Sequence, residues 1–289
     1  MKEIAIIGST ASGKTALSID IAKKTDSIIL SLDSLSVYKE IDIASAKPTK
    51  EERGDIVHFG IDEVYPNEKF GVIEFIKIYK KAKEYATKHN KNLIIVGGTG
   101  FYLKALVEGL STGIEKEVPL ESSLEKTYEL LYKLDKKYME KISKNDSYRI
   151  RKAFSIYKQS GMTPSDYFEL NPKEPVAKDL KIFEILWDRE ELKKRIALRT
   201  HQMIKDGIID EVIHLESKYT REPNCMNSIG IIETLEYLDG KLDKKELEEK
   251  ISLNTAKLAK RQNTFNKSQF KDKTSNFIEN LNSDILKFF

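Results

Sequence analysis

The chain has 289 residues, of which 40% are hydrophobic and 9% aromatic, so it is long enough to bury a core without covalent crosslinks and too apolar to be disordered. Its 49 Lys and Arg residues nearly balance 46 Asp and Glu residues, and a net charge of +3 excludes a strong overall field. The single cysteine, Cys225, excludes an internal disulfide framework and a cysteine-based zinc cluster, and only four histidines are present.

The N-terminus leads directly into a strand-like run at Ile4, so we expect no signal peptide. No apolar run reaches the length of about 18 residues that a membrane span needs. We therefore expect a cytoplasmic protein without a membrane partner. We also expect the protein to be a monomer.

The first hundred residues alternate between strand and helix patterns. Short runs of β-branched residues predict buried strands, and apolar residues at helical spacing predict helices. The strands are expected over residues 4–7, 28–30 and 93–96, and the helices over 14–24 and 72–89. This order is typical of an α/β fold with a doubly wound parallel sheet.

The pattern changes after about Gly109. The next 65 or so residues have charged helical spacing, are interrupted by prolines and contain no clear buried strand. We interpret residues 112–178 as a helical insertion domain within a core formed by residues 1–111 and 179–289. The alternative is a continuous helical half without a separate core.

Strand character returns once after this block. A strand is expected over residues 181–187, and helices over 189–205, 208–219, 228–238 and 243–265. From about Ser275 the chain is rich in asparagine, and we expect this end to be peripheral.

A phosphate-binding motif follows the first strand. It matches G-x-x-x-x-G-K-[ST], and its residues are Gly8, Ser9, Thr10, Ala11, Ser12, Gly13, Lys14 and Thr15. Glycine lets the backbone bring its N–H groups against a phosphate, and the N-terminus of the following helix adds partial positive charge. Lys14 would reach phosphate oxygens, and the Thr15 hydroxyl would bind Mg²⁺. The motif predicts a P-loop phosphate site.

Two further strand ends are expected at the same edge of the sheet, because parallel strands direct their carboxyl ends toward the ligand. Asp33 follows the second strand and would bind Mg²⁺, accept a proton or cap the next turn. The third strand ends in Val96-Gly97-Gly98-Thr99 without the acid that motor and switch NTPases carry there. The two glycines predict close approach of a ligand or another backbone, and Thr99 is a candidate hydrogen-bonding group.

Basic residues form three clusters in this nearly neutral chain. Their members are Arg149, Arg151 and Lys152; Arg189, Lys193, Lys194, Arg195 and Arg199; and Lys257, Lys260, Arg261, Lys267, Lys271 and Lys273. A solvated helix face, a nucleic-acid footprint and an arginine that closes over phosphates are all compatible with such clusters.

The motifs together resemble the tRNA dimethylallyltransferases, also called isopentenyltransferases. The P-loop with Ala16 and Leu17 is similar to that of this family, and the similarity continues in order to about residue 265. The further matches are Ser31–Ser34, Val37–Lys39, Asp42-Ile43, Ala46–Pro48, Val96–Gly100 with Tyr102, Asn145-Asp146, Arg149–Ala153, Arg195, Arg199, Met203, Gly207, Glu211-Val212 and Ala259–Gln262. Segments 229–233 and 263–267 depart from the family pattern.

The resemblance implies a reaction, its substrates and a set of site residues. The family transfers a dimethylallyl group from dimethylallyl diphosphate to N6 of the adenine at position 37, next to the anticodon of tRNA. It implies that the P-loop binds the diphosphate with Mg²⁺, that Asp33 is the general base, that Thr10 acts at the transfer site and that Arg199 binds the departing diphosphate. The implied contacts to the anticodon stem-loop are Asp33, Ser34, Leu35, Ser36, Thr99, Tyr148, Arg149, Ile150, Arg151 and Lys152.

Two other functions share some of these features. A P-loop small-molecule or nucleoside kinase would have the same loop, the same fold and an acid after the second strand, but would consume ATP. A phosphate-binding protein that contacts RNA without catalysis would share the P-loop and the basic clusters. The presence of Asp33 and Arg199 argues against this last function.

Overall fold

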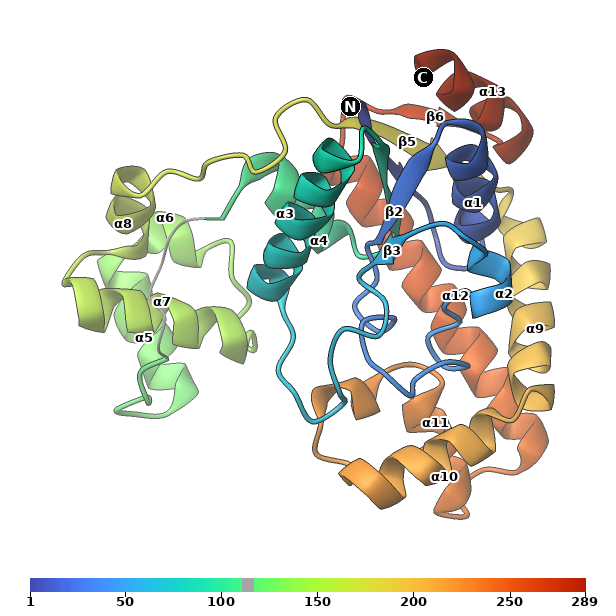
Figure 1. Cartoon of the computed structure of the whole chain (residues 1–289). Coiled ribbons are helices and arrows are strands. Elements are labelled where there is room, and N and C mark those ends of the chain that lie inside the picture. Colours follow the sequence, from blue (N-terminus) through green and yellow to red (C-terminus); the bar gives the residue numbers. More distant parts are fainter. Residues whose placement is uncertain (111–116) are drawn as a thin grey trace. The chain divides into compact units, whose positions relative to one another are not determined.

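The computed structural model describes residues 1–110 and 117–289, and it divides into two compact units (Figure 1). The core unit comprises Met1–Lys104 and Ala177–Phe289, and the helical unit comprises Ala105–Val176. The boundary expected between residues 111 and 112 lies outside the described residues. No helix in the described part of the chain is long and apolar enough to cross a membrane.

The core unit contains a sheet of six parallel strands in the order β3-β2-β4-β1-β5-β6. The central residues of β1, β2 and β4 are apolar and buried because both faces of the sheet are covered. The register places Ile6 of β1 between Val96 of β4 and Phe183 of β5. The strands are β1 (Glu3–Ile7), β2 (Ser27–Ser31), β3 (His58–Phe59), β4 (Asn92–Gly97), β5 (Lys181–Ile185) and β6 (Thr274–Asn276). The predicted α/β class with a doubly wound parallel sheet is confirmed.

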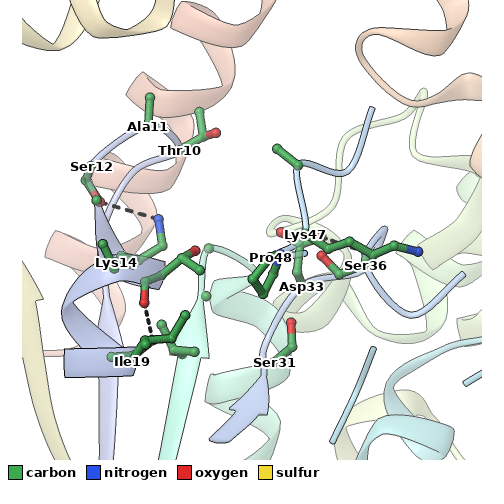
Figure 2. A pocket seen from close by; sticks show the side chains of 18 of the residues that line it. Thr10, Ala11, Ser12, Lys14, Ile19, Ser31, Asp33, Ser36, Lys47 and Pro48 are labelled. Atoms are coloured by element: carbon green, nitrogen blue, oxygen red, sulfur yellow. Dashed lines mark hydrogen bonds between the residues drawn. The ribbon is translucent and has the colours of Figure 1, made fainter. Parts of the chain in front are cut away.

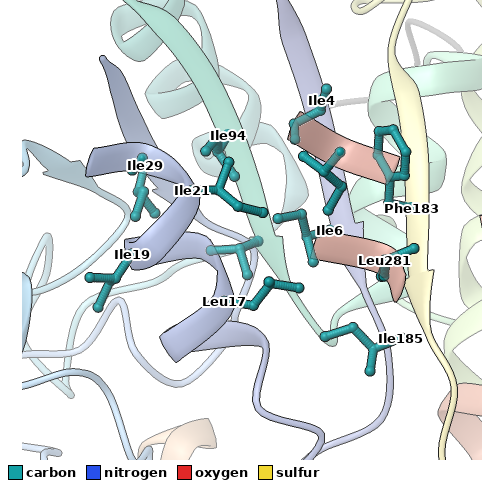
Figure 3. Close-up of a cluster of buried hydrophobic side chains, with 13 residues drawn as sticks. Ile4, Ile6, Leu17, Ile19, Ile21, Ile29, Ile94, Phe183, Ile185 and Leu281 are labelled. Atoms are coloured by element: carbon teal, nitrogen blue, oxygen red, sulfur yellow. The ribbon is translucent and has the colours of Figure 1, made fainter. Parts of the chain in front are cut away.

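Helices cover both faces of this sheet. The helices whose residues lie wholly or partly in the core unit are α1 (Lys14–Lys24), α2 (Lys50–Arg53), α3 (Val72–Lys88), α4 (Gly100–Glu108), α9 (Arg189–Lys205), α10 (Ile208–Tyr219), the 3₁₀ turn η1 (Asn224–Asn227), α11 (Ile231–Leu238), α12 (Lys244–Gln269) and α13 (Ile278–Phe288). One face packs against α1 and α13, where Leu17 and Leu281 meet Ile6 in a buried cluster (Figure 3). On the other face α3 packs against β2, β3 and β4.

The expectation that the chain is peripheral from Ser275 onward is wrong. Residues 274–276 form β6, which pairs in parallel with β5, and α13 buries Leu281 and Ile285 completely in the main core. Apolar side chains recur at positions 278, 281 and 285, so one stripe of this helix is apolar, while asparagines elsewhere dilute the average composition. Spacing, not composition, decides where this segment lies.

The helical unit has a core of its own. Its helices beyond the end of α4 are α5 (Leu124–Leu134), α6 (Lys136–Met139), α7 (Ser147–Ser160) and α8 (Pro164–Leu170), and its described residues contain no strand. Leu131, Met139 and Ile150 are fully buried in one apolar cluster. The Asp135 carboxylate caps α6 through the N–H of Tyr138 and also accepts hydrogen bonds from Ser165. These contacts hold four short helices together.

Candidate active site

A cleft of about 930 Å³ opens at the carboxyl ends of β1, β2 and β4 in the core unit. The P-loop lies on one side of this cleft, and the segment from Ser31 to Pro48 lies on the other (Figure 2). Arg195 and Arg199 of α9 and Gln262 of α12 also line it. The cleft therefore gathers residues that are up to 252 positions apart in the sequence.

The P-loop connects β1 to α1 through backbone conformations that few residues adopt. Ala11 and Gly13 have φ angles of 61° and 84°, in the left-handed region. Gly13 is the N-cap of α1 and has no side chain to occupy the first N–H groups of that helix. Those N–H groups and the helix dipole are available to an anion in the cleft.

Lys14 lies at the bottom of this loop. Its Nζ donates to the carbonyl of Ser9 at 2.5 Å and to the hydroxyl of Ser12 at 3.4 Å (Figure 2). The pKa of Lys14 is lowered to about 7, chiefly by burial and in addition by the nearby charge of Arg199, while the charge of Asp33 opposes the fall. Because anionic oxygens would offset this desolvation, the site favours a phosphate beside Lys14.

Arg199 and Thr10 lie together at the mouth of the loop. The guanidinium of Arg199 donates to the Thr10 hydroxyl at 3.2 Å, and burial lowers the pKa of Arg199 while Asp33 raises it. The Thr10 N–H donates to Gln262 at 2.8 Å, and Gln262 in turn donates to the carbonyl of Gly98 at 3.1 Å. A single glutamine of α12 thus ties the P-loop to the end of β4.

A second arginine of α9 also contacts the P-loop. The Nε of Arg195 donates to the carbonyl of Ala11 at 2.8 Å, and its guanidinium stacks 4.4 Å from the ring centroid of Trp187. The indole N–H of Trp187 donates to the carbonyl of Ser12 at 2.9 Å. No local sequence pattern predicts the contacts that Trp187 and Gln262 make with the P-loop. Gln262 belongs to a segment that matches the family pattern, and this match is the one sequence signal for its role. Trp187 has no such signal.

Asp33 faces the cleft from the loop after β2. One carboxylate oxygen, Oδ1, accepts hydrogen bonds from the N–H groups of Leu35 at 2.8 Å and Ser36 at 3.3 Å. Among the described residues no donor is bonded to Oδ2. The capping role considered for Asp33 is therefore met by one oxygen, which leaves the other for chemistry.

The two glycines at the carboxyl end of β4 leave room for neighbouring groups that come very close. A side chain at Gly97 would collide with the carbonyl of Leu32, and one at Gly98 would collide with Gln262. Thr99 links the same two loops, since its N–H donates to the Leu32 carbonyl at 3.1 Å and its hydroxyl accepts from the Ser34 N–H at 3.2 Å. The expected close approach of another backbone is therefore found at Gly97, whereas Gly98 makes room for the side chain of Gln262.

The cleft offers hard oxygen ligands for Mg²⁺. The Thr15 residue is exposed at the start of α1, and the carboxylate of Asp33 lines the same cleft. Within the described ranges no cluster of three or more His, Cys, Asp or Glu side chains could enclose a metal. Mg²⁺ commonly keeps several waters and shares one or two protein ligands with substrate phosphates, so this donor set fits it.

The remaining candidate RNA contacts differ in exposure. Ser34 is exposed and Ser36 is buried, while Leu35 packs partly against an apolar cluster. In the helical unit, Tyr148, Arg149 and Arg151 are exposed on α7, Lys152 is half-buried, and the side chain of Ile150 is fully buried in that unit's core. Any RNA surface on α7 therefore consists of the neighbours of Ile150, because its own side chain has no path to a ligand.

A basic groove runs along α12 in the core unit. Lys257, Lys260 and Arg261 line a hollow of about 870 Å³ together with Thr264 and Phe265. The basic residues and the aromatic residue Phe265 thus line one concave surface. A helix face that is merely solvated would instead be convex. This combination is typical of surfaces that bind single-stranded nucleic acid.

Comparison with known proteins identifies the family. The family model described as IPP transferase matches residues 36–269. The tRNA dimethylallyltransferase of Aliarcobacter butzleri is 73% identical over 100% of this chain and 99% of its own, and that of Sulfurovum sp. is 52% identical over 99% and 98%.

Solved structures agree with the sequence relatives. The tRNA isopentenylpyrophosphate transferase of Bacillus halodurans has a TM-score of 0.75 at 27% identity, covering 99% of this chain and 95% of that one. A eukaryotic dimethylallyltransferase described as acting on tRNA has a TM-score of 0.86 at 26% identity, covering 96% and 74%. The resemblance stated from the sequence motifs is confirmed, and the chain belongs to the IPP transferase family of tRNA dimethylallyltransferases.

Proposed function

We propose that this protein transfers a dimethylallyl group from dimethylallyl diphosphate to N6 of the adenine at tRNA position 37 and releases diphosphate. The observation that carries the proposal is the convergence of Lys14, Arg199 and Asp33 on one cleft of a chain that belongs to this family. The cleft combines an anion site with a carboxylate, which are the two groups that such a transfer needs.

The P-loop binds the diphosphate of the donor. As the bond between the allylic carbon and the diphosphate oxygen breaks, negative charge grows on the leaving group. The N–H groups at the start of α1, the ammonium of Lys14 and the guanidinium of Arg199 stabilise that charge. The Thr15 hydroxyl would hold Mg²⁺, which would supply further positive charge when bound.

Asp33 acts as the general base. The amino nitrogen of adenine is a poor nucleophile, so a carboxylate within hydrogen-bond reach assists by taking its proton as the new C–N bond forms. Two backbone N–H groups hold Asp33 Oδ1, and Oδ2 is the oxygen that would accept the proton. The hydroxyl of Thr10 accepts a hydrogen bond from Arg199, so in this mechanism it would act at the transfer site beside the departing diphosphate.

The tRNA presents its adenine as a flipped-out base, because N6 is inaccessible in a stacked loop. Contacts to the anticodon stem-loop come from Ser34, Thr99, the exposed residues of α7 and the basic groove of α12. We further propose that the protein works as a monomer in the cytoplasm, where its substrate tRNA is found.

The test is incubation of the purified protein with radiolabelled dimethylallyl diphosphate and unmodified tRNA, with and without Mg²⁺. We expect label in the tRNA, at the adenine of position 37, only when Mg²⁺ is present. A tRNA with another base at position 37 is the control and should remain unlabelled. Phosphorylation of a small-molecule acceptor by ATP, with no label in tRNA, would instead establish a kinase.

A further inference from the structure

The segment between β2 and α2 carries Asp33 at one end and Pro48 at the other, and both ends line the cleft. Its residues 32–49 contain only turns and one isolated bridge, so the segment has no ladder or helix of its own to hold its shape. A catalytic carboxylate on such a loop needs anchors elsewhere, because small displacements of a reacting group are costly.

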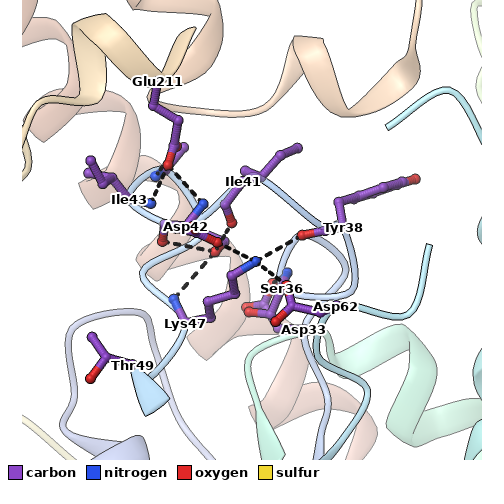
Figure 4. Close-up of polar contacts among 12 residues, drawn as sticks. Asp33, Ser36, Tyr38, Ile41, Asp42, Ile43, Lys47, Thr49, Asp62 and Glu211 are labelled. Atoms are coloured by element: carbon purple, nitrogen blue, oxygen red, sulfur yellow. Dashed lines mark hydrogen bonds and ion pairs between the residues drawn. The ribbon is translucent and has the colours of Figure 1, made fainter. Parts of the chain in front are cut away.

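Glu211 provides one of these anchors from the first turn of α10. Its carboxylate accepts hydrogen bonds from three successive backbone N–H groups, those of Asp42 at 2.8 Å, Ile43 at 2.7 Å and Ala44 at 2.9 Å (Figure 4). Burial raises the pKa of Glu211, and the three amide donors oppose that rise. All three hydrogen bonds of this half-buried carboxylate go to residues 42–44, so Glu211 fixes the position of that part of the segment.

Lys47 holds the same segment from within. Its side chain is 6% exposed, and Nζ lies 2.6 Å from Asp42 and 2.5 Å from Asp62. It also donates to the carbonyl of Tyr38 at 3.0 Å (Figure 4). The ammonium thus lies between two carboxylates and joins the segment to Asp62, which follows β3.

The position of Glu211 in the chain gives this anchor a second consequence. Helix α10 follows α9 after two residues, and α9 carries Arg199. Glu211 therefore ties the loop that bears Asp33 to the helical pair that bears Arg199. Asp33, the proposed proton acceptor, and Arg199, which would bind the leaving diphosphate, lie on opposite sides of one cleft. The carboxylate of Glu211 links the two sides.

We propose that Glu211 is a positioning residue for the transfer reaction, which sets the place of Asp33 relative to Arg199 by holding residues 42–44. The inference rests on the proposed function and adds a residue that touches neither substrate. Its test is Glu211→Gln, which keeps the size of the side chain but turns an NH₂ group toward backbone N–H donors. The matched control is Asp210→Asn, an exposed acid in the same first turn of α10.

The measurement is the single-turnover transfer rate at saturating donor and tRNA, with donor affinity and thermal unfolding measured in parallel. We expect Glu211→Gln to lower the rate by roughly 10- to 100-fold, the cost of a misplaced reacting group, with donor affinity and Asp210→Asn close to wild type. In an Asp33→Asn background, Glu211→Gln should cause little further loss, because the residual rate no longer depends on that carboxylate. Losses that multiply in the double variant would show a merely structural role and overturn the inference.

A second variant keeps the test decisive if Glu211→Gln does not fold. Lys47→Met removes the other anchor of the segment, and its rate loss should likewise vanish in the Asp33→Asn background. Wild-type rates for either folded variant overturn the inference. If Asp33→Asn itself transfers at the wild-type rate, the proposed function of Asp33 fails instead, so the two failures are distinct.

Discussion

Asp33 uses its two carboxylate oxygens differently, and this difference makes a sharp prediction. In Asp33→Asn the amide oxygen still accepts the N–H groups of Leu35 and Ser36, so the local turn should survive. Only the ability to take a proton is lost. Donor binding should persist, and the transfer rate should fall by about 10²- to 10⁴-fold, the usual contribution of general acid–base catalysis.

Single-turnover transfer across a range of Mg²⁺ concentrations separates the roles considered for Asp33. A metal ligand would show its loss in metal and diphosphate affinity, with partial rescue by excess Mg²⁺. A residue that only caps the turn would leave the rate close to wild type. That last result would remove Asp33 from the mechanism.

Lys14 makes donor binding depend on pH. Burial lowers the pKa of Lys14 to about 7 in the free protein, and an adjacent diphosphate raises it, because opposite charge favours the ammonium form. Below pH 7 the group is already charged and contributes no pH dependence. Above pH 7 binding must take up a proton, so affinity should fall as pH rises, by at most tenfold per pH unit.

Calorimetric titration of the donor in two buffers with different ionisation enthalpies measures this proton uptake. The phosphate groups themselves titrate near pH 6, so the measurement is made at pH 8. Lys14→Arg is the control, since a guanidinium remains charged and should bind without uptake. Equal uptake by the wild type and Lys14→Arg would show that another group accounts for it.

At the scale of elements, α13 completes the core of the sheet. Leu281 is fully buried against β1, β5 and α1, and truncation of such a leucine leaves a cavity. We expect Leu281→Ala to lower the free energy of unfolding by about 2–5 kcal/mol. Chemical denaturation measures the change, and Leu253→Ala, at a residue that is 56% exposed on α12, is the control. A Leu281 variant as stable as this control would place α13 outside the cooperative core.

The basic elements predict a salt dependence of tRNA binding. Lys260 lines the groove of α12, and Arg151 is exposed on α7. If each contacts one phosphate, Lys260→Ala and Arg151→Ala should each weaken binding and reduce the slope of log affinity against log salt by about 0.7–0.9. Donor affinity should not change.

Lys245 is the matched control for this measurement. It lies at the other end of α12, is 84% exposed and does not line the groove. Lys245→Ala removes the same charge from the same helix and should leave the slope at its wild-type value. Wild-type slopes for Lys260→Ala and Arg151→Ala would identify both clusters as solvated surfaces.

At the scale of the whole molecule, ligand binding and folding are linked. The anion site of the cleft is assembled from β1, α1, α9 and α12, so the unfolded chain has no such site. Donor at 100 times its dissociation constant should therefore stabilise the protein by about 2.7 kcal/mol. Thermal unfolding with and without donor and Mg²⁺ measures this, and Lys14→Ala should abolish the shift while it keeps the fold. Stabilisation by ATP but not by the donor would favour a kinase.

Local sequence signals determined much of this protein. The strands at residues 4–7, 28–30 and 93–96 and the helices at 14–24 and 72–89 follow from the period of apolar residues, which is set by backbone geometry alone. The P-loop follows from glycines and a lysine whose contacts lie within eight residues of one another. The sequence predicts that Asp33 and Thr99 face the cleft because each follows a parallel strand, and the carboxyl ends of parallel strands lie at the same edge of the sheet.

Other features depended on contacts between distant parts of the chain. Gln262 reaches Thr10 across 252 positions, Trp187 reaches Ser12 across 175, and Glu211 reaches Ala44 across 167. A glutamine, a tryptophan and a glutamate on helices or loops have no local pattern that names their partners. The sequence by itself determined the elements and the phosphate site, because these arise from short-range geometry. Only the tertiary structure decided which side chains hold that site in place, because their hydrogen bonds exist only after the sheet and its helices have packed.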